Sequence, residues 1–305
     1  MFRAIILKTA SASPVRSLVT RSFLFRPLVR RFVAGETLDE AMAAAKALAH
    51  IGLMSTLDLL GENVSNLEEA EASTTAYIEI VERIGTSEFK NQVNISIKLT
   101  ALGLDFGTDV AEANYRKVVR AAEKYDVFVR VDMEGSDYTE KTIQVVRRVF
   151  NDHKNTGTVL QSYLRRTPGD VQTLVEQGMR IRLVKGAYLE PESVAFKDKA
   201  DVDDQYVKCG QTLLRNGNYP AIATHDRAIV DKLKSYCEQE SVGKDKFEWQ
   251  MLYGIARDLQ NGLHEAGYAV RVYVPYGSQW YPYFSRRLAE RPANLFFILK
   301  SLFKK

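Results

Sequence analysis

The sequence predicts a (β/α)8 barrel, because strand-like and helix-like segments alternate along it. Eight short runs are rich in β-branched and aromatic residues, and segments with helical periodicity lie between most of them. The alternation occupies roughly 270 residues, which suits a barrel of this kind. A doubly wound sheet is the competing fold, since it is built from the same β–α–β units.

The predicted strands follow one another in chain order. They are residues 54–60, 93–99, 127–133, 158–163, 181–187, 220–225, 247–253 and 270–276. Residues 66–84 and 110–125 are examples of the helical segments between them. No linker, low-complexity tract or short repeat requires a second folded domain, so we assign residues 35–305 to the barrel.

A basic arm precedes the barrel in residues 1–34. It contains seven Lys or Arg and no acid, so it contributes +7 to a net charge of +4 and leaves the rest of the chain mildly acidic. This distribution argues against a nucleic-acid surface spread over the fold. The arm has the composition of a transit peptide. We favour an amphipathic helix that packs on the barrel or lies on a membrane surface, followed by a helix whose start Thr37 and Glu40 mark as a capping box.

The two cysteines, Cys209 and Cys237, are far apart and have no metal-ligand spacing. Cysteines used in this way predict a reduced, cytoplasmic protein, and no metal site is expected. No apolar run reaches the length of a membrane span. Peripheral contact with the inner face of a membrane stays open as one role for the arm.

Polar side chains stand at the carboxyl ends of most predicted strands. In a barrel of this kind the catalytic groups lie at these ends, above an interior expected to be mostly branched and apolar. A mixed set of cations, acids and amides on so many strands favours a functional site at the barrel mouth. The set comprises Glu62, Lys98, Asp132, Gln161, Arg182, Lys185, Thr224 and His225.

Arg182 and Lys185 lie on opposite faces of one predicted strand, and Gly186 lets the backbone come close to a ligand. A buried cation needs a partner, because burying a lone charge is costly. A flavin or a phosphate would supply one. A structural carboxylate would serve equally well, and the strand pattern does not separate these two interpretations.

Lys98 ends a predicted strand, where a lysine either anchors an anion or acts as a Schiff-base nucleophile. An adjacent Asp132 would keep the lysine charged, which counts against the Schiff base. His225 has ring nitrogens suited to a cofactor, although a single histidine is more often structural. Neither a G-x-G-x-x-G motif nor a P-loop occurs, so a nucleotide cofactor would bind across the barrel mouth.

The segment 276–294 contains two adjacent arginines among aromatic residues. At 100° per residue, Tyr283, Arg286, Arg287 and Glu290 fall within about a 100° arc of a helix. Pro282 fits only the first turn, so the helix should begin near residue 280 or 281. Paired guanidinium groups match a planar carboxylate. The alternative is a surface helix with ordinary ion pairs, in which Glu290 or Glu62 is the partner.

Ten motifs occur in the order found in one family, within a match that runs from about residue 33 to residue 304. The chain thereby resembles the proline dehydrogenase family, in particular the compact monofunctional bacterial members and the dehydrogenase domain of bifunctional enzymes. The motifs are FVAGET, LDLLGE, SIKLTALG, VDME, GTVLQSYLRRT, IRLVKGAYLEP, ATHD, FEWQMLYGI, RVYVPYG and YFSRRLAERPAN.

The resemblance implies a distorted barrel that binds FAD noncovalently, with the last helix over its mouth. Arg286 and Arg287 would hold the carboxylate of L-proline, and Glu62 would pair with Arg286 as a gate. Asp132 would order Lys98 and the polar network. The same pocket would be lined by Lys98, Tyr273, Tyr283 and Leu252.

On the cofactor side, the resemblance implies that Arg182 lies near the reactive flavin nitrogen. Asp132 and Arg182 would be the catalytic residues. The remaining FAD contacts would be Met133, Gln161, Lys185, Gly186, Ala187, Thr224 and His225. Leu189 departs from the bifunctional relatives, which have tryptophan there, so an aromatic contact with the flavin is lost or supplied elsewhere.

The implied reaction is hydride transfer from proline C5 to flavin N5, which yields 1-pyrroline-5-carboxylate in the first step of proline catabolism to glutamate. The amine must be unprotonated for its lone pair to assist, and the flavin carries out the redox step. Electrons would pass to a membrane quinone. There are two alternatives. One is a Schiff-base lyase or aldolase that uses Lys98 or Lys185, and the other is a non-catalytic carboxylate-binding barrel.

Overall fold

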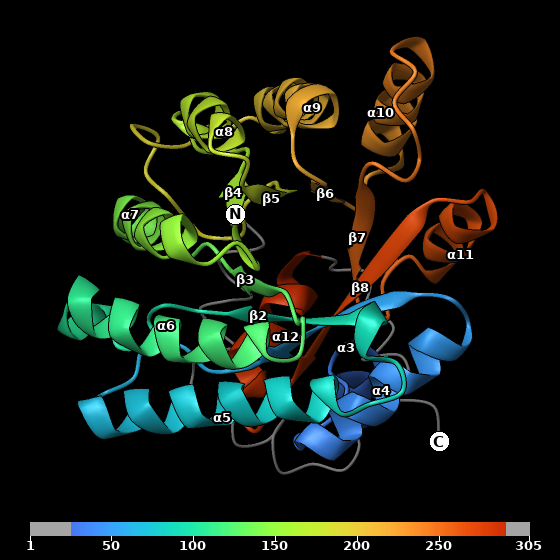
Figure 1. Ribbon diagram of the computed structural model, residues 1–305. Coiled ribbons are helices and arrows are strands. Elements are labelled where there is room, and N and C mark those ends of the chain that lie inside the picture. The colour runs from blue at the N-terminus through green and yellow to red at the C-terminus, as the bar shows by residue number, and fades with distance from the viewer. Residues whose placement is uncertain (1–25, 291–305) are drawn as a thin grey trace, which may run out of the picture.

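The computed structural model describes residues 26–290, which form a closed barrel of eight parallel strands (Figure 1). Each strand overlaps one of the eight predicted runs. The doubly wound alternative is excluded because the first strand pairs with the last and closes the sheet. The strands are β1 (Met54–Leu59), β2 (Val93–Ile97), β3 (Val129–Val131), β4 (Thr156–Gln161), β5 (Arg180–Val184), β6 (Ala221–Ala223), β7 (Glu248–Leu252) and β8 (Ala269–Tyr276).

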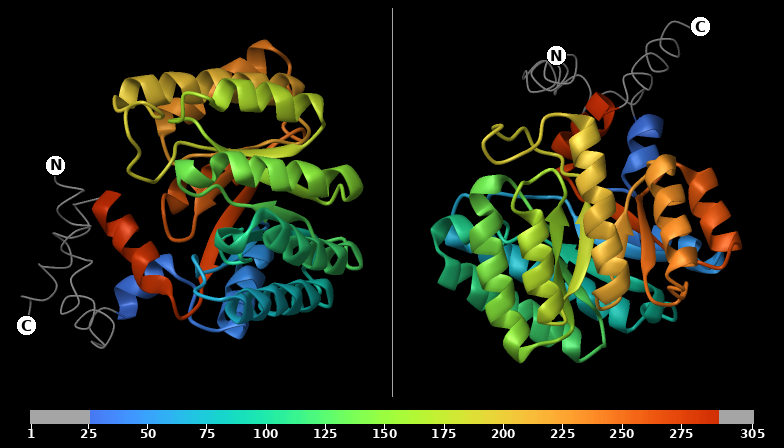
Figure 2. Two further views of the ribbon diagram at one scale, coloured as in Figure 1. Left: turned by 90° about the vertical axis from the view of Figure 1, so that its left-hand side faces the viewer. Right: turned by 90° about the horizontal axis from the view of Figure 1, so that it is seen from above.

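Helices surround the barrel (Figure 2). Of those described, eight follow strands β1 to β8, directly or after a short connection, and two precede β1. The helices are α3 (Arg26–Phe32), α4 (Leu38–His50), α5 (Leu67–Gly85), α6 (Thr108–Glu123), α7 (Ser136–Asp152), α8 (Thr167–Glu176), α9 (Lys199–Asn216), α10 (Arg227–Gln239), α11 (Arg257–Glu265) and α12 (Trp280–Glu290). The 3-10 turns η2 (Lys90–Gln92) and η3 (Leu104–Phe106) flank β2.

Two predicted helix starts are confirmed. Thr37 Oγ1 accepts a hydrogen bond from Glu40 N at 3.3 Å, and Glu40 Oε2 accepts one from Thr37 N at 3.2 Å, which completes the capping box of α4. Helix α12 begins at Trp280 and carries Pro282 in its first turn. Backbone N–H groups in the first turn have no acceptor within the helix, so the N–H that proline lacks costs no hydrogen bond.

Helix α3 packs beside α12 at one end of the barrel (Figure 2). The rings of Phe32 and Phe284 lie 6.4 Å apart, and Val29 and Trp280 are buried in the same cluster. Residues 1–25 of the predicted basic arm lie outside the described residues. The division of the chain into an arm and a barrel therefore stays a prediction.

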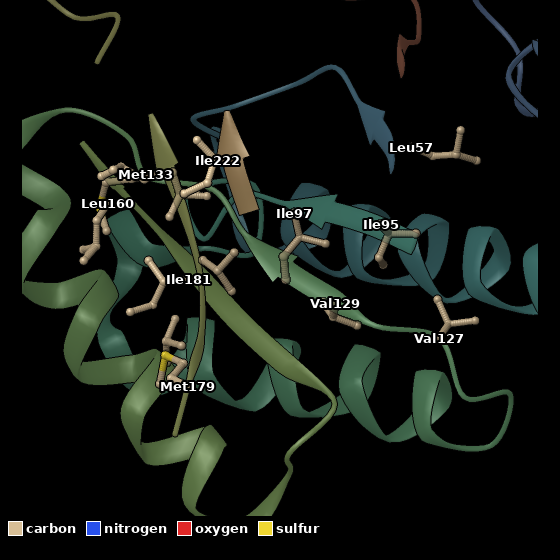
Figure 3. Close-up of a cluster of buried hydrophobic side chains, with 14 of the residues drawn as sticks. Leu57, Ile95, Ile97, Val127, Val129, Met133, Leu160, Met179, Ile181 and Ile222 are labelled. Carbon is tan, nitrogen blue, oxygen red and sulfur yellow. The ribbon is translucent and has the colours of Figure 1, made fainter. Parts of the chain in front are cut away.

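The main hydrophobic core lies between the strands and the surrounding helices. Alternate residues of β2, such as Ile95 and Ile97, join it together with Tyr77 and Ile80 of α5 (Figure 3). The other residues of β2, Asn94 and Ser96, are buried and polar. The expectation of a mostly apolar barrel interior is therefore wrong, because hydrogen bonds within the interior replace the apolar layers. The buried polar residues of the strands include Thr56, Asp58, Asn94, Ser96, Arg130, Arg182, Glu248, Gln250 and Arg271.

Candidate active site at the barrel mouth

Lys98 is buried at the end of β2 and forms an ion pair with Asp58 of the neighbouring strand β1. The Nζ–Oδ1 distance is 2.7 Å. Burial alone would lower the pKa of Lys98, but the nearby Asp58, with contributions from Tyr77 and Asp132, outweighs burial and raises it. Lys98 is therefore held charged. Strand β2 has β1 on one side and β3 on the other, and the direct partner of Lys98 is Asp58 of β1 and not, as expected, Asp132 after β3.

Asp132 instead holds Arg182 and Tyr273. Its backbone N–H bonds to Ile97 O at 2.8 Å, which fixes it beside the end of β2. Arg182 Nη1 donates to Asp132 Oδ1 at 2.7 Å, and the Tyr273 hydroxyl donates to Asp132 Oδ2 at 2.6 Å. The Arg182 guanidinium also lies over the Tyr273 ring, 5.3 Å from its centroid. Burial raises the pKa of Tyr273, so its hydroxyl keeps the proton that it donates.

Lys185 has carboxylate partners as well. Its Nζ lies 2.5 Å from Asp203 Oδ1 and 2.8 Å from Asp226 Oδ2, so Lys185, like Arg182, has a carboxylate partner. The hydrogen bond from Lys185 lowers the pKa of Asp226 to about 2. The exposed Lys199 contacts the same two acids, and two lysines and two acids therefore form one cluster beside β5 and β6.

Helix α12 meets the barrel mouth through an ion pair. Arg286 Nη1 lies 3.3 Å from Glu62 Oε1, and both side chains are about a quarter exposed, at 23% and 25%. Tyr283 is buried, and the Arg287 guanidinium lies 5.3 Å from the centroid of its ring. Of the four residues predicted to share a face, Arg286 thus contacts the mouth, and Arg287 packs on Tyr283 of the same helix. The side chain of Glu290 lies outside the described residues.

The expected cofactor residues lie on or just after β3, β4, β5 and β6. Gln161 Nε2 donates to Glu134 O at 3.2 Å, next to the buried Met133. His225 Nε2 accepts from Leu252 N at 2.8 Å, so its other ring nitrogen carries the proton when the ring is neutral. Thr224 Oγ1 accepts from Asp226 N at 3.1 Å.

Gly186 sits in the backbone between Lys185 and Ala187, where its φ angle is +116°. A Cβ at this position would lie 2.3 Å from the ring of Tyr163. Only glycine fits both the conformation and the space. Leu189, a little further on, is 69% exposed, and its side chain therefore does not enter the mouth as a stacking aromatic residue would.

Sequence reasoning missed Glu134, a buried acid at the end of β3. The Thr100 hydroxyl donates to its Oε1 at 2.5 Å, and Thr100 N donates to its Oε2 at 3.3 Å. Burial raises the pKa of Glu134 to about 7. Asp58, Ser96 and Gln250 were missed as well. Their signal in the sequence is a polar residue at every second position of an otherwise apolar strand.

Two buried polar atoms allow a test of whether these residues fit a flavin. Among residues 26–290, Arg182 Nη2 and Gln161 Oε1 have no hydrogen-bond partner. One is a donor and the other an acceptor, and buried polar groups are normally satisfied. The edge of a flavin ring offers both carbonyl acceptors and an N–H donor. The residues present therefore fit a flavin.

The described part of the chain lacks both a cluster of metal ligands and a membrane-spanning helix. No group of three or more His, Cys, Asp or Glu side chains there could hold a metal ion. None of the helices described is both long and apolar enough to cross a membrane.

The fold and the mouth define a (β/α)8-barrel enzyme with polar residues at the carboxyl ends of its strands and an arginine pair on the helix that follows the last strand. A family model described as proline dehydrogenase matches residues 41–299. The chain is 40% identical over 307 residues to proline dehydrogenase from Deinococcus radiodurans, covering 100% of this chain and 98% of that protein. It is 39% identical over 287 residues to proline dehydrogenase 2 from Bacillus subtilis, covering 94% of each.

A solved structure of proline utilization A (PutA) from Bdellovibrio bacteriovorus, inactivated by N-propargylglycine, has the same fold. The TM-score is 0.83 at 27% identity, and the likeness covers 100% of this chain and 38% of that one. The chain belongs to the proline dehydrogenase family. It is an oxidoreductase of the monofunctional bacterial kind, since its monofunctional relatives match it along nearly their whole length.

Proposed function

We propose that this protein oxidises L-proline to 1-pyrroline-5-carboxylate with FAD as its cofactor, as the first step of proline catabolism to glutamate. The observation that carries the proposal is the contact between Arg286 and Glu62. It brings the arginine pair of α12 to the mouth of the barrel, where Asp132 and Arg182 lie.

Substrate binding follows from the chemistry of this pair. Arg286 and Arg287 offer forked donors that suit the planar carboxylate of proline. Glu62 already binds Nη1 of Arg286, and a guanidinium group has further N–H donors that can hold a second carboxylate. The Arg286–Glu62 pair would therefore act as a gate that closes over the substrate. The charged Lys98 and the side chains of Tyr273, Tyr283 and Leu252 would line the rest of the pocket.

The cofactor would be held by residues on or just after β3, β4, β5 and β6. They are Met133, Gln161, Arg182, Lys185, Gly186, Ala187, Thr224 and His225. When bound, FAD supplies hydride acceptance at N5 from proline C5 and then electron transfer to a membrane quinone. Arg182 supplies a fixed positive charge beside it, and a preorganised cation stabilises negative charge that develops during the reaction. Asp132 keeps this cation in place through its 2.7 Å hydrogen bond.

The protonation state of the substrate amine controls the proposed reaction. The proline nitrogen must be neutral when the hydride leaves, so the mouth should favour the free amine. Lys98 and the two arginines place positive charge around the pocket, which disfavours a protonated amine in the same space. The proposed reaction should therefore be faster at higher pH until the substrate amine is fully deprotonated.

A Schiff-base lyase on the same barrel is disfavoured by the structure. A nucleophilic lysine must lose its proton, and the ion pair with Asp58 raises the pKa of Lys98 instead. The amine of Lys185 is engaged by two carboxylates, those of Asp203 and Asp226, and is therefore not free to attack a carbonyl. Borohydride with a carbonyl substrate should accordingly give no lysine adduct.

The decisive experiment is a visible spectrum of the purified protein before and after anaerobic addition of L-proline. We expect a yellow protein with flavin absorbance that bleaches with L-proline and regains colour with a soluble quinone. D-proline serves as the matched control. A protein that stays colourless after incubation with FAD would contradict the proposal, and so would bound flavin that L-proline does not reduce.

A further inference from the structure

A column of hydrogen-bonded side chains runs along the barrel interior between β7 and β8 and ends at Arg182. Arg271 Nε donates to both carboxylate oxygens of Glu248, at 2.9 and 3.1 Å. Gln250 Nε2 donates to Glu248 Oε1. Arg182 Nε donates to Gln250 Oε1 at 2.5 Å. All four residues are buried.

Strand geometry explains how the column forms. Glu248 and Gln250 are two residues apart on β7, so their side chains point to the same side of the sheet. Gln250 pairs in register with Arg271 of β8, and parallel neighbours in register project on the same face. Arg182 reaches the column from β5. The four side chains therefore come from three strands and meet inside the barrel.

The chemistry of the column permits one orientation of the Gln250 amide. A guanidinium group can only donate hydrogen bonds, and an ionised carboxylate can only accept them. The amide nitrogen must therefore face Glu248, and the amide oxygen must face Arg182. Burial alone would raise the pKa of Glu248, but Arg271 and Gln250 outweigh burial and lower it, which keeps this acid ionised.

Arg182 has three fixed contacts that lock its guanidinium. Asp132 Oδ1 and Ser96 Oγ bind Nη1 at 2.7 and 3.1 Å, and Gln250 binds Nε. Contacts on Nη1 alone would allow the group to swing about that nitrogen. The Nε contact stops this motion and determines where the remaining nitrogen, Nη2, points.

We propose that Gln250 is a positioning residue for Arg182, and that Glu248 and Arg271 fix Gln250 in the orientation this role requires. The inference rests on the proposed function, in which Arg182 lies beside bound FAD. It assigns a role in tuning the cofactor to residues that touch neither the cofactor nor the substrate. A tightly held cation favours the reduced, more negative cofactor, and a loosely held one favours it less.

The test is the two-electron midpoint potential of the flavin bound to the Gln250→Met variant. Methionine has a similar volume but offers neither the acceptor for Arg182 nor the donor for Glu248. We expect the reduction equilibrium to become about tenfold less favourable, a shift of about 30 mV to more negative potential. Flavin content should remain near that of the wild type.

Gln260→Met is the matched control. Gln260 and Gln250 are both 3% exposed, and Gln260 also makes two hydrogen bonds through Nε2, to Leu252 O and Ile255 O. It makes no hydrogen bond to Arg182. This variant should lose stability without a change in midpoint potential. A structural role for Gln250 would give both variants the same result.

Glu248→Gln is the second test and keeps the side-chain shape. A neutral amide at 248 can donate to Gln250, which allows the Gln250 amide to turn its nitrogen towards Arg182. We expect the midpoint potential of the flavin to become more negative, by less than in Gln250→Met. If Gln250→Met does not fold, this variant tests the positioning role of Gln250 in its place.

If Gln250→Met folds and its flavin has the midpoint potential of the wild type, Gln250 does not position Arg182. The proposed function would stand in that case. If Gln250→Met does not fold, an unchanged potential in Glu248→Gln would lead to the same conclusion. A wild-type protein that binds no FAD would overturn both the positioning role and the proposed function.

Discussion

The ammonium group of Lys98 lies 2.7 Å from the carboxylate of Asp58, and both side chains are almost fully buried, at 9% and 1% exposure. A buried pair of this kind is stable only while both partners are present, because each alone would be an uncompensated charge in the barrel. The pair also gives the proposed substrate pocket a permanently charged lysine.

Removing one partner of this pair should be strongly destabilising. We expect Lys98→Met to lower the free energy of unfolding by about 3–5 kcal/mol, because Asp58 is left buried without a counter-charge. Urea unfolding followed by circular dichroism measures the change. Lys117→Met is the control, since the N–O distance of the Lys117–Glu71 pair is 2.8 Å, close to the 2.7 Å of Lys98–Asp58, but its side chains are 47% and 59% exposed. Equal losses in the two variants would contradict this account.

The arginine pair should govern affinity for the substrate. Arg286→Met and Arg287→Met are each expected to raise the KM for L-proline by about 10- to 100-fold, because a charge-assisted hydrogen bond contributes roughly 1.5–3 kcal/mol. The flavin spectrum of both variants should match that of the wild type. Arg215→Met, which breaks an exposed ion pair between α9 and α10, should leave KM unchanged. Loss of flavin from both α12 variants would indicate a structural role instead.

Glu134 should make stability depend on pH. Burial raises its pKa from 4.5 to about 7 in the folded protein, so the folded state retains a proton that the unfolded state releases. This contribution to stability is complete below pH 4.5 and is lost as pH rises through 7. Glu134→Gln should remove this pH-dependent loss of stability. At pH 8 its free energy of unfolding should be roughly 2 kcal/mol higher than that of the wild type.

The measurement is a series of urea unfolding curves between about pH 5 and pH 8.5, a range that brackets the expected transition. The difference between Glu134→Gln and wild type should grow with pH. A control at the exposed Glu88 should give parallel profiles. A difference that is constant across the range would show that Glu134 does not titrate there.

Gly186 should be required for cofactor binding. A Cβ at this position meets the Tyr163 ring at 2.3 Å, and the φ angle of +116° disfavours any other residue. We expect Gly186→Ala to weaken FAD binding by tenfold or more and to cost about 1–3 kcal/mol of stability. Gly262→Ala in α11 has nothing within 4 Å of the added Cβ and should leave FAD binding unchanged. Isothermal titration of FAD into cofactor-depleted protein distinguishes the two.

Local patterns were sufficient to predict the elements. Alternation of apolar residues located all eight strands, Thr37 and Glu40 marked the start of α4, and Pro282 limited where α12 could begin. The residues expected at the barrel mouth do lie at strand ends, because the carboxyl ends of parallel strands share one edge. Their roles towards proline and FAD remain predictions.

Pairings across the barrel could not be predicted in the same way. The partner of Lys98 depends on which strands are neighbours and on their register, and Asp58 is 40 positions away in the chain. Gln250 and Arg182 are 68 positions apart. The polar interior was missed because alternation shows that a strand has two faces but not which face is enclosed. Here the apolar face packs on the helices, and the polar face fills the barrel.

The pairing of β1 with β8 has a consequence for synthesis of the protein. Met54 is matched with Arg271, 217 positions later, so the barrel cannot close until nearly the whole chain has left the ribosome. Until then β1 has an unpaired edge, the kind of surface that recruits strands from other chains. The arginine pair follows β8 directly, and we therefore expect incomplete chains to combine an aggregation-prone edge with no capacity to bind the substrate.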